Sequence, residues 1–289
     1  MTDVLLATFS AMPDGEPGGS MLLDELASRG LTGRWATWDD PTVDWGGARL
    51  VAVRSTWDYE QQRDRFLSWT REVEAATVLV NPARVAEWNT DKIYLLELLD
   101  AGLPVVPTQA AEDESELPAA IAAFENAVVK PRVAAGGRGV VVFDGMPGGP
   151  PGLDESQLSL GPWIVQPVVE SIRTEGETSV FVLGGRVVSQ VQKVPAAGEI
   201  RVHESFGGRS VPVAVTEEAS SLALATVALA EKVLDTRLPL ARVDLMRLVD
   251  GTLALSELEV TEPGLYLDIV PENARAYVDA LVAVLEDGL

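Results

Sequence analysis

The sequence predicts a mixed α/β protein, in which a parallel strand–helix unit precedes a largely antiparallel region. Short apolar runs alternate with amphipathic segments over roughly residues 1–85, a pattern typical of a parallel sheet covered by helices. Towards the C-terminus, apolar runs flank Gly-Gly and Asp-Gly pairs, which are favoured turns of antiparallel hairpins. Hydrophobic residues form 47% of the 289 residues, so the chain can bury a sizeable core.

In the N-terminal unit, four apolar runs are expected to form strands: residues 4–9, 31–40, 48–56 and 77–82. Helices are expected over residues 21–30, which end in glycine, and over residues 59–76, whose apolar side chains have helical spacing.

The third of these strands ends at Arg54, Ser55 and Thr56. Ligands of parallel α/β sheets bind beyond the carboxyl ends of the strands, so these residues are candidates for substrate binding. The Arg54 guanidinium is suited to clamp a carboxylate. The alternative interpretation is a loop arginine that pairs with Asp58.

Further along, helices are expected over residues 116–127, 217–234 and 271–289, and strands over residues 128–133, 162–169, 178–194, 208–215 and 241–260. Residues 144–161 repeat Gly and Pro and are expected to form an irregular connection.

Lysine is scarce in this chain, because only four of the 22 basic residues are lysines: Lys92, Lys130, Lys193 and Lys232. Lys92 follows Asn89, Thr90 and Asp91, which are favoured helix N-caps, so it is expected in a first helical turn. The helix dipole disfavours a cation there. We therefore expect Lys92 to face an anion, although all four lysines could equally be ordinary surface residues.

Acidic and basic residues alternate on two strands near the C-terminus. A period of two places Arg242 with Asp244 on one face, and Glu257 with Glu259 on one face of the next strand. A hairpin turn at Asp250-Gly251 would bring the strands side by side. Three carboxylates then converge, and such hard oxygen ligands suit Mg²⁺; the alternative is a solvated hairpin face.

Residues 128–143 read VVKPRVAAGGRGVVVF, in which a glycine cluster separates two apolar runs. The stretch is either a hairpin tip or a loop that covers phosphates, and the glycines alone do not decide between them.

The composition excludes several function classes. The chain has no cysteine, which excludes disulfides, thiolate nucleophiles and Cys-ligated metal sites. A net charge of −22 and the lack of a basic run argue against nucleic-acid and membrane partners. The first residues lack the features of a signal peptide, so a cytoplasmic protein is expected.

Taken in order, several segments resemble the ATP-grasp superfamily of carboxylate–amine ligases, which includes bacterial glutathione synthetases. The segments are VVKPRVAAGGRGV, IVQPVV, GETSVFV, KVPAAGEIRVHESFGGR, RVDLMR and LSELEV. The segments RSTWDY, AAGEIRVH and LSELEVTEPGLYL are most similar to a bacterial branch that includes O-ureidoserine cyclo-ligases. The resemblance implies a pre-ATP-grasp α/β domain at residues 1–87, a central lid subdomain at 88–165 and a C-terminal antiparallel subdomain at 166–289.

The resemblance also implies roles for individual residues. ATP would be held by Lys92, Lys130, Gly136, Gly137, Gly139, Gln166, Val168 and Glu177. One or two Mg²⁺ ions, or Mn²⁺ in their place, would be held by Asp244, Glu257 and Glu259. Charge in the transition state would be stabilised by Arg242, Lys193 and Arg201. Substrate would be bound by Arg54, Ser55, Thr56, Arg201 and His203.

Glu259 and His203 differ from the other candidate residues in ways that bear on their roles. Glu259 stands where the family usually has asparagine, which adds a negative charge to the metal cluster. His203 is the only histidine and is either a catalytic base or a structural residue of a mobile loop.

The expected activity is ATP-dependent activation of a small amino-acid-like carboxylate as an acyl phosphate, followed by attack of an amine, including intramolecular cyclisation. The alternatives are an intermolecular ligase that forms a dipeptide or modifies a peptide, and a nucleotide-binding regulatory protein without activity. The resemblance implies a small-molecule substrate and is compatible with a homodimer.

Overall fold

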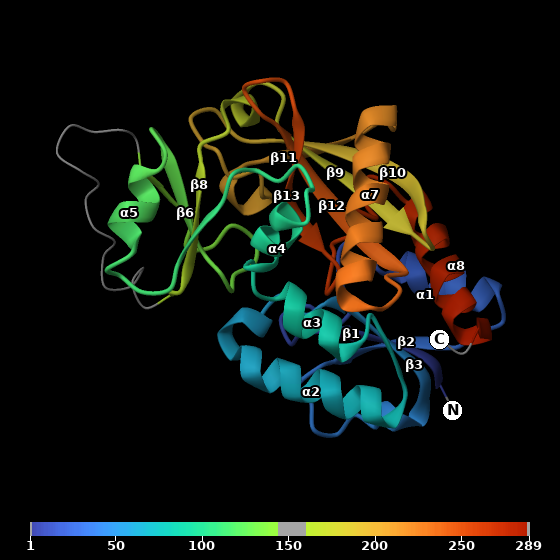
Figure 1. The fold of residues 1–289 in the computed structure, drawn as a ribbon. Helices are drawn as coiled ribbons and strands as arrows, with labels where there is room; N and C mark the ends of the chain where they lie inside the picture. Colours follow the sequence, from blue (N-terminus) through green and yellow to red (C-terminus); the bar gives the residue numbers. More distant parts are fainter. Residues whose placement is uncertain (1, 144–159, 288–289) are drawn as a thin grey trace.

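The computed structural model describes residues 2–143 and 160–287, and its three sheets confirm the predicted mixed α/β fold. Figure 1 shows the N-terminal sheet at the bottom, a small sheet with helix α5 at the left, and the C-terminal sheet with helix α7 at the upper right. Most of the irregular connection expected over residues 144–161 lies outside the described residues.

The N-terminal sheet is parallel throughout, in the order β2-β1-β3-β4. Its strands are β1 (Thr2–Thr8), β2 (Gly33–Thr37), β3 (Ala48–Ser55) and β4 (Val78–Val80). Alternate residues of β1 enter different cores: Val4 and Leu6 pack with the helices α1 and α8, whereas Leu5 and Ala7 pack with α2. Both faces of the sheet are therefore buried, which explains the continuous apolar runs.

The helices of this part are α1 (Ser20–Ser28), α2 (Arg63–Ala76) and α3 (Ala83–Asn89), with short 3₁₀ turns at Trp45–Gly47 and Tyr59–Gln62. Helix α3 was not predicted. Asn89 ends this helix instead of capping the next one, and Lys92 precedes helix α4 (Tyr94–Asp100) instead of lying in its first turn. The prediction that Lys92 lies in the first turn of a helix was therefore wrong, and the helix-dipole argument does not apply to it.

The small sheet has the order β5-β8-β6-β7 and is antiparallel. Its strands are β5 (Gln109–Ala111), β6 (Ala127–Pro131), β7 (Val141–Phe143) and β8 (Trp163–Pro167). Helix α5 (Leu117–Ala122) packs against it, and the glycine-containing stretch joins β6 to β7.

The C-terminal sheet has the order β11-β10-β9-β12-β13. Its strands are β9 (Glu177–Leu183), β10 (Arg186–Val194), β11 (Arg209–Val213), β12 (Leu240–Arg247) and β13 (Leu253–Glu259), and 3₁₀ turns lie at Glu170–Arg173 and Glu204–Phe206. The Gly184-Gly185 and Asp250-Gly251 hairpins are confirmed.

Two helices cover this sheet: α7 (Glu217–Leu234) and α8 (Glu272–Asp287). Helix α7 buries Ala223 and Val227 against Val180 and Val243. The next residues along the strands, Ser179 and Asp244 among them, face the other way and are also buried. On the face opposite α7, Phe181 and Leu183 pack with α8, whereas Ser179 and Asp244 form a polar region of the sheet. No helix of the described residues is long and apolar enough to span a membrane.

Gly176, just before β9, lies very close to the backbone of the neighbouring strand β10. Its φ is +80°, and an added Cβ would lie 2.1 Å from the carbonyl oxygen of Lys193. Gly185 has a similar φ of +72°, but a Cβ added there would have no atom within 4 Å. We expect Gly185→Ala to lower the free energy of unfolding by about 1–2 kcal/mol and Gly176→Ala by about 3 kcal/mol or more, measured by urea denaturation. Equal losses would contradict the close approach.

Candidate active site

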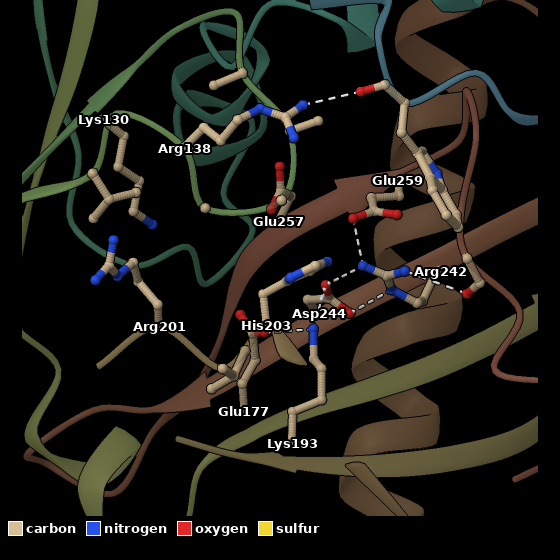
Figure 2. Close-up of a pocket in the computed structure, with 18 of the residues that line it drawn as sticks. Lys130, Arg138, Glu177, Lys193, Arg201, His203, Arg242, Asp244, Glu257 and Glu259 are labelled. Atoms are coloured by element: carbon tan, nitrogen blue, oxygen red, sulfur yellow. Dashed lines mark hydrogen bonds and ion pairs between the residues drawn. The ribbon is translucent and has the colours of Figure 1, made fainter. Parts of the chain in front are cut away.

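A pocket of about 560 Å³ is lined by residues from all three sheet regions. The small sheet contributes Lys130, the C-terminal sheet contributes Asp244 and Glu257, and the N-terminal unit contributes Glu16 and Trp57. Figure 2 shows Lys130 and Arg201 on one side of this pocket and the charged groups around Asp244 on another.

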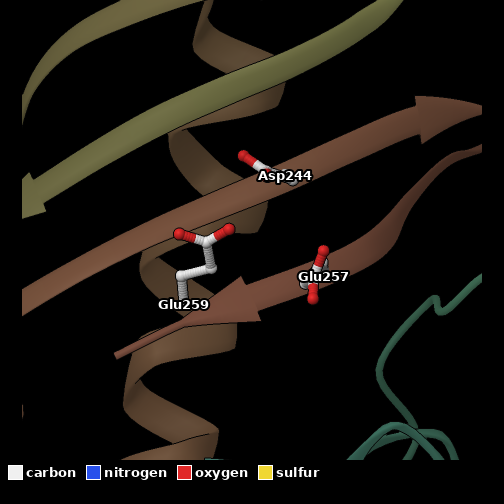
Figure 3. A group of neighbouring side chains, drawn as sticks. All are labelled: Asp244, Glu257 and Glu259. Carbon is white, nitrogen blue, oxygen red and sulfur yellow. The ribbon is translucent and has the colours of Figure 1, made fainter. Parts of the chain in front are cut away.

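Three carboxylates meet on strands β12 and β13 (Figure 3). Asp244 lies directly opposite Glu257, and Arg242 lies opposite Glu259. The alternation predicted each pair on one face of its strand, and a register shift between Asp244 and Leu245 brings the two pairs to the same face. One oxygen from each of Asp244, Glu257 and Glu259 lies within 4.8 Å of the others. These oxygen donors fit a hard divalent cation such as Mg²⁺.

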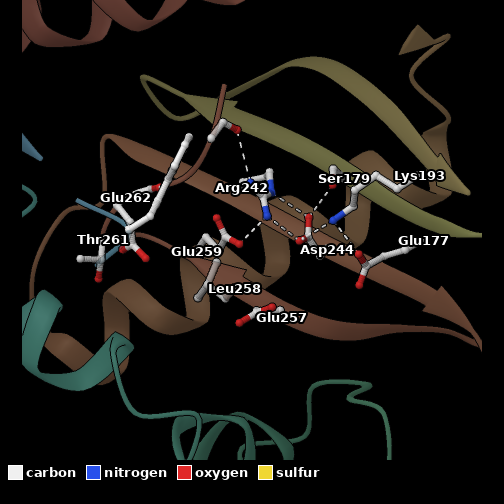
Figure 4. Close-up of polar contacts among 12 residues, drawn as sticks. Glu177, Ser179, Lys193, Arg242, Asp244, Glu257, Leu258, Glu259, Thr261 and Glu262 are labelled. Atoms are coloured by element: carbon white, nitrogen blue, oxygen red, sulfur yellow. Dashed lines mark hydrogen bonds and ion pairs between the residues drawn. The ribbon is translucent and has the colours of Figure 1, made fainter. Parts of the chain in front are cut away.

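Two buried cations hold this acidic group together (Figure 4). The Arg242 guanidinium donates to both oxygens of Asp244, at 3.0 and 2.9 Å, and to Glu259. The Lys193 ammonium lies 2.9 Å from Asp244 and 2.5 Å from Glu177. Burial opposes the charge on Asp244, but the charges of Arg242 and Lys193 hold its pKa well below the usual range. Partial burial raises the pKa of Glu259 to about 8, although Arg242 opposes this rise.

Lys92 links the acidic group to the glycine-containing loop. Its ammonium donates to the carbonyl oxygen of Ala134 at 2.6 Å and lies 3.2 Å from Glu257. Lys130, at the end of β6, donates to Gln166 at 2.8 Å, and desolvation lowers its pKa. Both lysines therefore line the pocket, next to the carboxylates.

The three glycines of the loop have positive φ values, but they serve two purposes. Gly136 and Gly137 line the pocket. Gly139 is not in the lining, and an added Cβ there would lie 2.7 Å from the ring of Pro131. Close packing against Pro131, and not contact with a ligand in this pocket, explains why position 139 is glycine.

Gln166, Val168 and Glu177, which were also predicted to hold ATP, line the pocket. Gln166 is buried and donates to Thr108 at 3.0 Å, and Glu177 pairs with Lys193. The N–H of Val168 already donates to the carbonyl of Asn126 at 2.9 Å. A ligand would therefore meet the carbonyl of Val168 and not its N–H.

The loop between β10 and β11 carries Arg201 and His203, and both line the pocket. The Arg201 guanidinium pairs with Glu199 at 2.6 Å and stacks 3.6 Å from the centre of the Phe206 ring. The Nδ1 atom of His203 accepts from the N–H of Ser205 at 3.2 Å and caps the following 3₁₀ turn. The structure thus gives His203 a structural contact on an exposed loop.

Arg54, Ser55 and Thr56 do not line the pocket, contrary to expectation. Arg54 is fully buried and pairs with Glu16 instead of Asp58, with its guanidinium 4.8 Å from the centre of the Tyr277 ring. Ser55 shares a hydrogen bond of 2.9 Å with Thr8. The loop that carries Glu16 covers the carboxyl end of β3. The structure therefore gives these three residues no direct contact with a ligand in the pocket.

A family model described as the ATP-grasp domain of prokaryotic glutathione synthetase matches residues 91–272, more than half of the chain. The chain belongs to this ATP-grasp family. It is therefore an ATP-dependent carboxylate–amine ligase, and the family uses ATP and a divalent metal ion.

A second model, the N-terminal domain of D-cycloserine synthetase DcsG, matches residues 4–81 of this ATP-grasp ligase. Among curated proteins, the cycloserine biosynthesis protein DcsG of Streptomyces lavendulae is 28% identical over 277 residues, which cover 92% of this chain and 93% of that protein. A glutathione synthetase of Prochlorococcus marinus is 30% identical over 64% of this chain and 57% of its own length.

Solved structures agree with the fold of this ligase. The crystal structure of D-cycloserine synthetase DcsG has a TM-score of 0.85 and 27% identity, and the comparison covers 98% of this chain and 99% of that one. The ATP-grasp ligase PsnB, solved with a minimal precursor, has a TM-score of 0.63 and 19% identity over 98% of this chain and 99% of its own, so it shows a shared fold.

Glu60 does not line the pocket of this ligase, but it contacts the loop that does, and the sequence did not single it out. Its carboxylate accepts from the N–H of Ala135 at 2.7 Å and from Arg138, which also donates to the carbonyl of Trp57 at 2.9 Å. Glu60 lies in the 3₁₀ turn after β3 of the N-terminal sheet, whereas Ala135 and Arg138 belong to the glycine-containing loop between β6 and β7. These contacts hold the loop against the N-terminal unit.

Replacing Glu60 by alanine is expected to release this loop. A charge-assisted hydrogen bond contributes about 1.5 kcal/mol or more, so the open population should rise roughly tenfold. The measurement is the rate of trypsin cleavage after Arg138 without nucleotide. Glu60→Gln keeps an acceptor for the N–H of Ala135 and should give an intermediate cleavage rate. An unchanged cleavage rate in both variants would show that Glu60 does not hold the loop against the N-terminal unit.

Proposed function

We propose that this ATP-grasp ligase activates the carboxylate of a small amino acid as an acyl phosphate and then joins it to an amine. One observation carries the proposal: Lys92 contacts both the glycine loop, through Ala134, and the acidic group, through Glu257 at 3.2 Å. If the loop binds phosphate and the acidic group binds metal, this contact joins the two in one pocket, as phosphoryl transfer requires.

The residues would divide the work as follows. Lys92, Lys130 and the amides at Gly136 and Gly137 would neutralise and orient the phosphates of ATP. Gln166, the carbonyl of Val168 and Glu177 would position its nucleoside. Asp244, Glu257 and Glu259 would hold Mg²⁺, which when bound lowers the repulsion between the phosphates and the attacking carboxylate.

In the first step, a carboxylate oxygen of the substrate forms a bond to the γ-phosphorus of ATP, and ADP leaves. In the second step, an amine attacks the acyl carbon, and phosphate leaves with loss of a proton from nitrogen. Arg242 and Arg201 would stabilise the charge on the transferred phosphoryl group, with Lys193 holding Asp244 in position. ATP would lie between the central subdomain, residues 88–165, and the C-terminal subdomain, residues 166–289, and residues 1–87 would form the domain that precedes them.

The similarity to DcsG over 92% of the chain supports O-ureidoserine as the first substrate to test, with ring closure by a nucleophile on the same molecule. The test is release of ADP and phosphate from Mg²⁺-ATP with O-ureidoserine isomers, small amino acids and amine acceptors, each alone and in pairs. We expect turnover with one compound alone and loss of its carboxylate. Turnover only with pairs would instead show an intermolecular ligase, and no release with any compound would refute the proposal.

A further inference from the structure

Glu262 differs from the other buried carboxylates of the pocket, Glu16, Glu177 and Asp244, because no lysine or arginine of the described residues forms an ion pair with it. It follows β13, lines the pocket and is only 8% exposed. Glu177, Asp244, Glu257 and Glu259 each form an ion pair with a lysine or arginine. Among residues 2–143 and 160–287, Glu262 has no such partner within 4.0 Å.

The backbone around Glu262 is fixed from several sides. Its own carbonyl accepts from the Trp57 indole at 3.2 Å, and Thr261 before it donates to Asn89. The carbonyl of Gly264 accepts from Arg242 at 3.3 Å, and the N–H of Leu265 donates to Glu16 at 2.8 Å. The carboxylate of Glu262 is therefore held at the pocket wall by a rigid segment.

A buried carboxylate without a counter-ion is costly. Burial and the charge of Glu257 raise the pKa of Glu262 to about 7, and the charges of Lys92 and Arg242 and a hydrogen bond with Tyr59 oppose this rise only in part. A ligand that brought a positive charge to Glu262 would remove most of this cost. The three-carboxylate group that fits a metal ion does not include Glu262 among the described residues, so a cation of another kind is indicated.

The surroundings favour an organic ammonium group. Trp57, Tyr59 and Tyr266 line the pocket. Trp57 and Tyr59 contact Glu262, and the Tyr266 ring centre lies 5.8 Å from the Arg242 guanidinium. Aromatic rings attract organic cations. Arg242, which contacts Gly264 in the Glu262 segment, offers a guanidinium to a carboxylate. Figure 4 shows Glu262 on the Arg242 side of the cluster, away from Lys193. One end of the pocket thus pairs an acceptor for ammonium with a donor for carboxylate.

We infer that Glu262 binds the ammonium group of an amino-acid substrate whose carboxylate is the group that becomes phosphorylated. The inference rests on the proposed function and makes it narrower, because it excludes simple carboxylic acids as good substrates. Glu262 would anchor the substrate without taking part in a bond-forming step.

The test compares D- and L-serine and D- and L-alanine with their analogues lacking the amino group, 3-hydroxypropanoate and propanoate. Hydroxylamine traps an acyl phosphate, because its nitrogen bonds to the acyl carbon, phosphate leaves and a proton is lost, and the hydroxamate is measured by its iron complex. We expect a lower KM for at least one amino acid than for its analogue. Glu262→Gln should raise the KM for that amino acid roughly 10- to 100-fold and leave the KM for the analogue unchanged.

Two variants control for structural effects. Glu262→Asp keeps the charge and should recover part of the affinity, and Glu114→Gln removes a charge at an exposed site outside the pocket and should change nothing. Equal KM values for amino acids and analogues, or an equal effect of Glu262→Gln on both, would overturn the inference alone. Absence of hydroxamate with every compound and also with the O-ureidoserine isomers, from a protein that still binds Mg²⁺-ATP, would overturn the proposed function and this inference with it.

Discussion

Replacing Glu257 by glutamine is expected to lower kcat for ADP release by roughly 10²- to 10³-fold, the range found when one group that stabilises transition-state charge is removed. Glu257 belongs to the three-carboxylate group and lies 3.2 Å from Lys92, so the variant weakens both the metal site and its link to the glycine loop. Glutamine has nearly the same size, and the fold should persist.

The measurement is steady-state ADP release over a range of Mg²⁺ concentrations, together with the thermal unfolding curve. Excess Mg²⁺ should restore part of the activity if Glu257 is a metal ligand. Glu125→Gln is the matched control, because Glu125 is exposed and does not line the pocket. Wild-type kcat in Glu257→Gln would show that the acidic group is not the catalytic centre.

Replacing Arg242 by alanine should give the largest loss of stability, about 3–5 kcal/mol in the free energy of unfolding. The guanidinium is 9% exposed and is the partner of both Asp244 and Glu259. Without it, the buried carboxylates Asp244 and Glu259 lose their shared cation and repel one another.

Urea denaturation with and without Mg²⁺ measures this effect. Mg²⁺ is expected to bind the native carboxylates and to recover part of the lost stability. Arg242→Lys keeps the charge but not the paired donors, so its free energy of unfolding should lie between those of the wild-type protein and Arg242→Ala. A loss below about 1 kcal/mol, typical of an exposed ion pair, would contradict a buried network.

The alternation of charged residues on the two C-terminal strands could be predicted from sequence because it depends on local geometry. A strand period of two places Arg242 with Asp244, and Glu257 with Glu259. The glycine turns could be predicted in the same way, from local sequence. The pairing next to the Asp250-Gly251 turn, with Leu245 opposite Leu255, would by itself put Glu257 opposite Val243, on the other face. A register shift between Asp244 and Leu245 puts Glu257 opposite Asp244 instead, and this shift could not be predicted from the sequence.

Other features depend on contacts between distant parts of the chain. Arg54 is buried because Glu16 and Tyr277 meet it, and nothing near Arg54 in sequence indicates either partner. Glu262 lies beyond the end of β13 and out of phase with Glu257 and Glu259, so the strand period could not place it in the pocket. Gly139 resembled its two neighbours, although Pro131 determines its position.

The central claim is that the substrate carboxylate takes the γ-phosphoryl group of ATP in this pocket. The most direct test uses the amino acid with the fastest ADP release, labelled with ¹⁸O in its carboxylate, and mass analysis of the phosphate produced. An acyl phosphate requires that one labelled oxygen passes to each phosphate, because the bond broken in the second step is between carbon and that oxygen. Unlabelled phosphate, or formation of AMP in place of ADP, would contradict the claim.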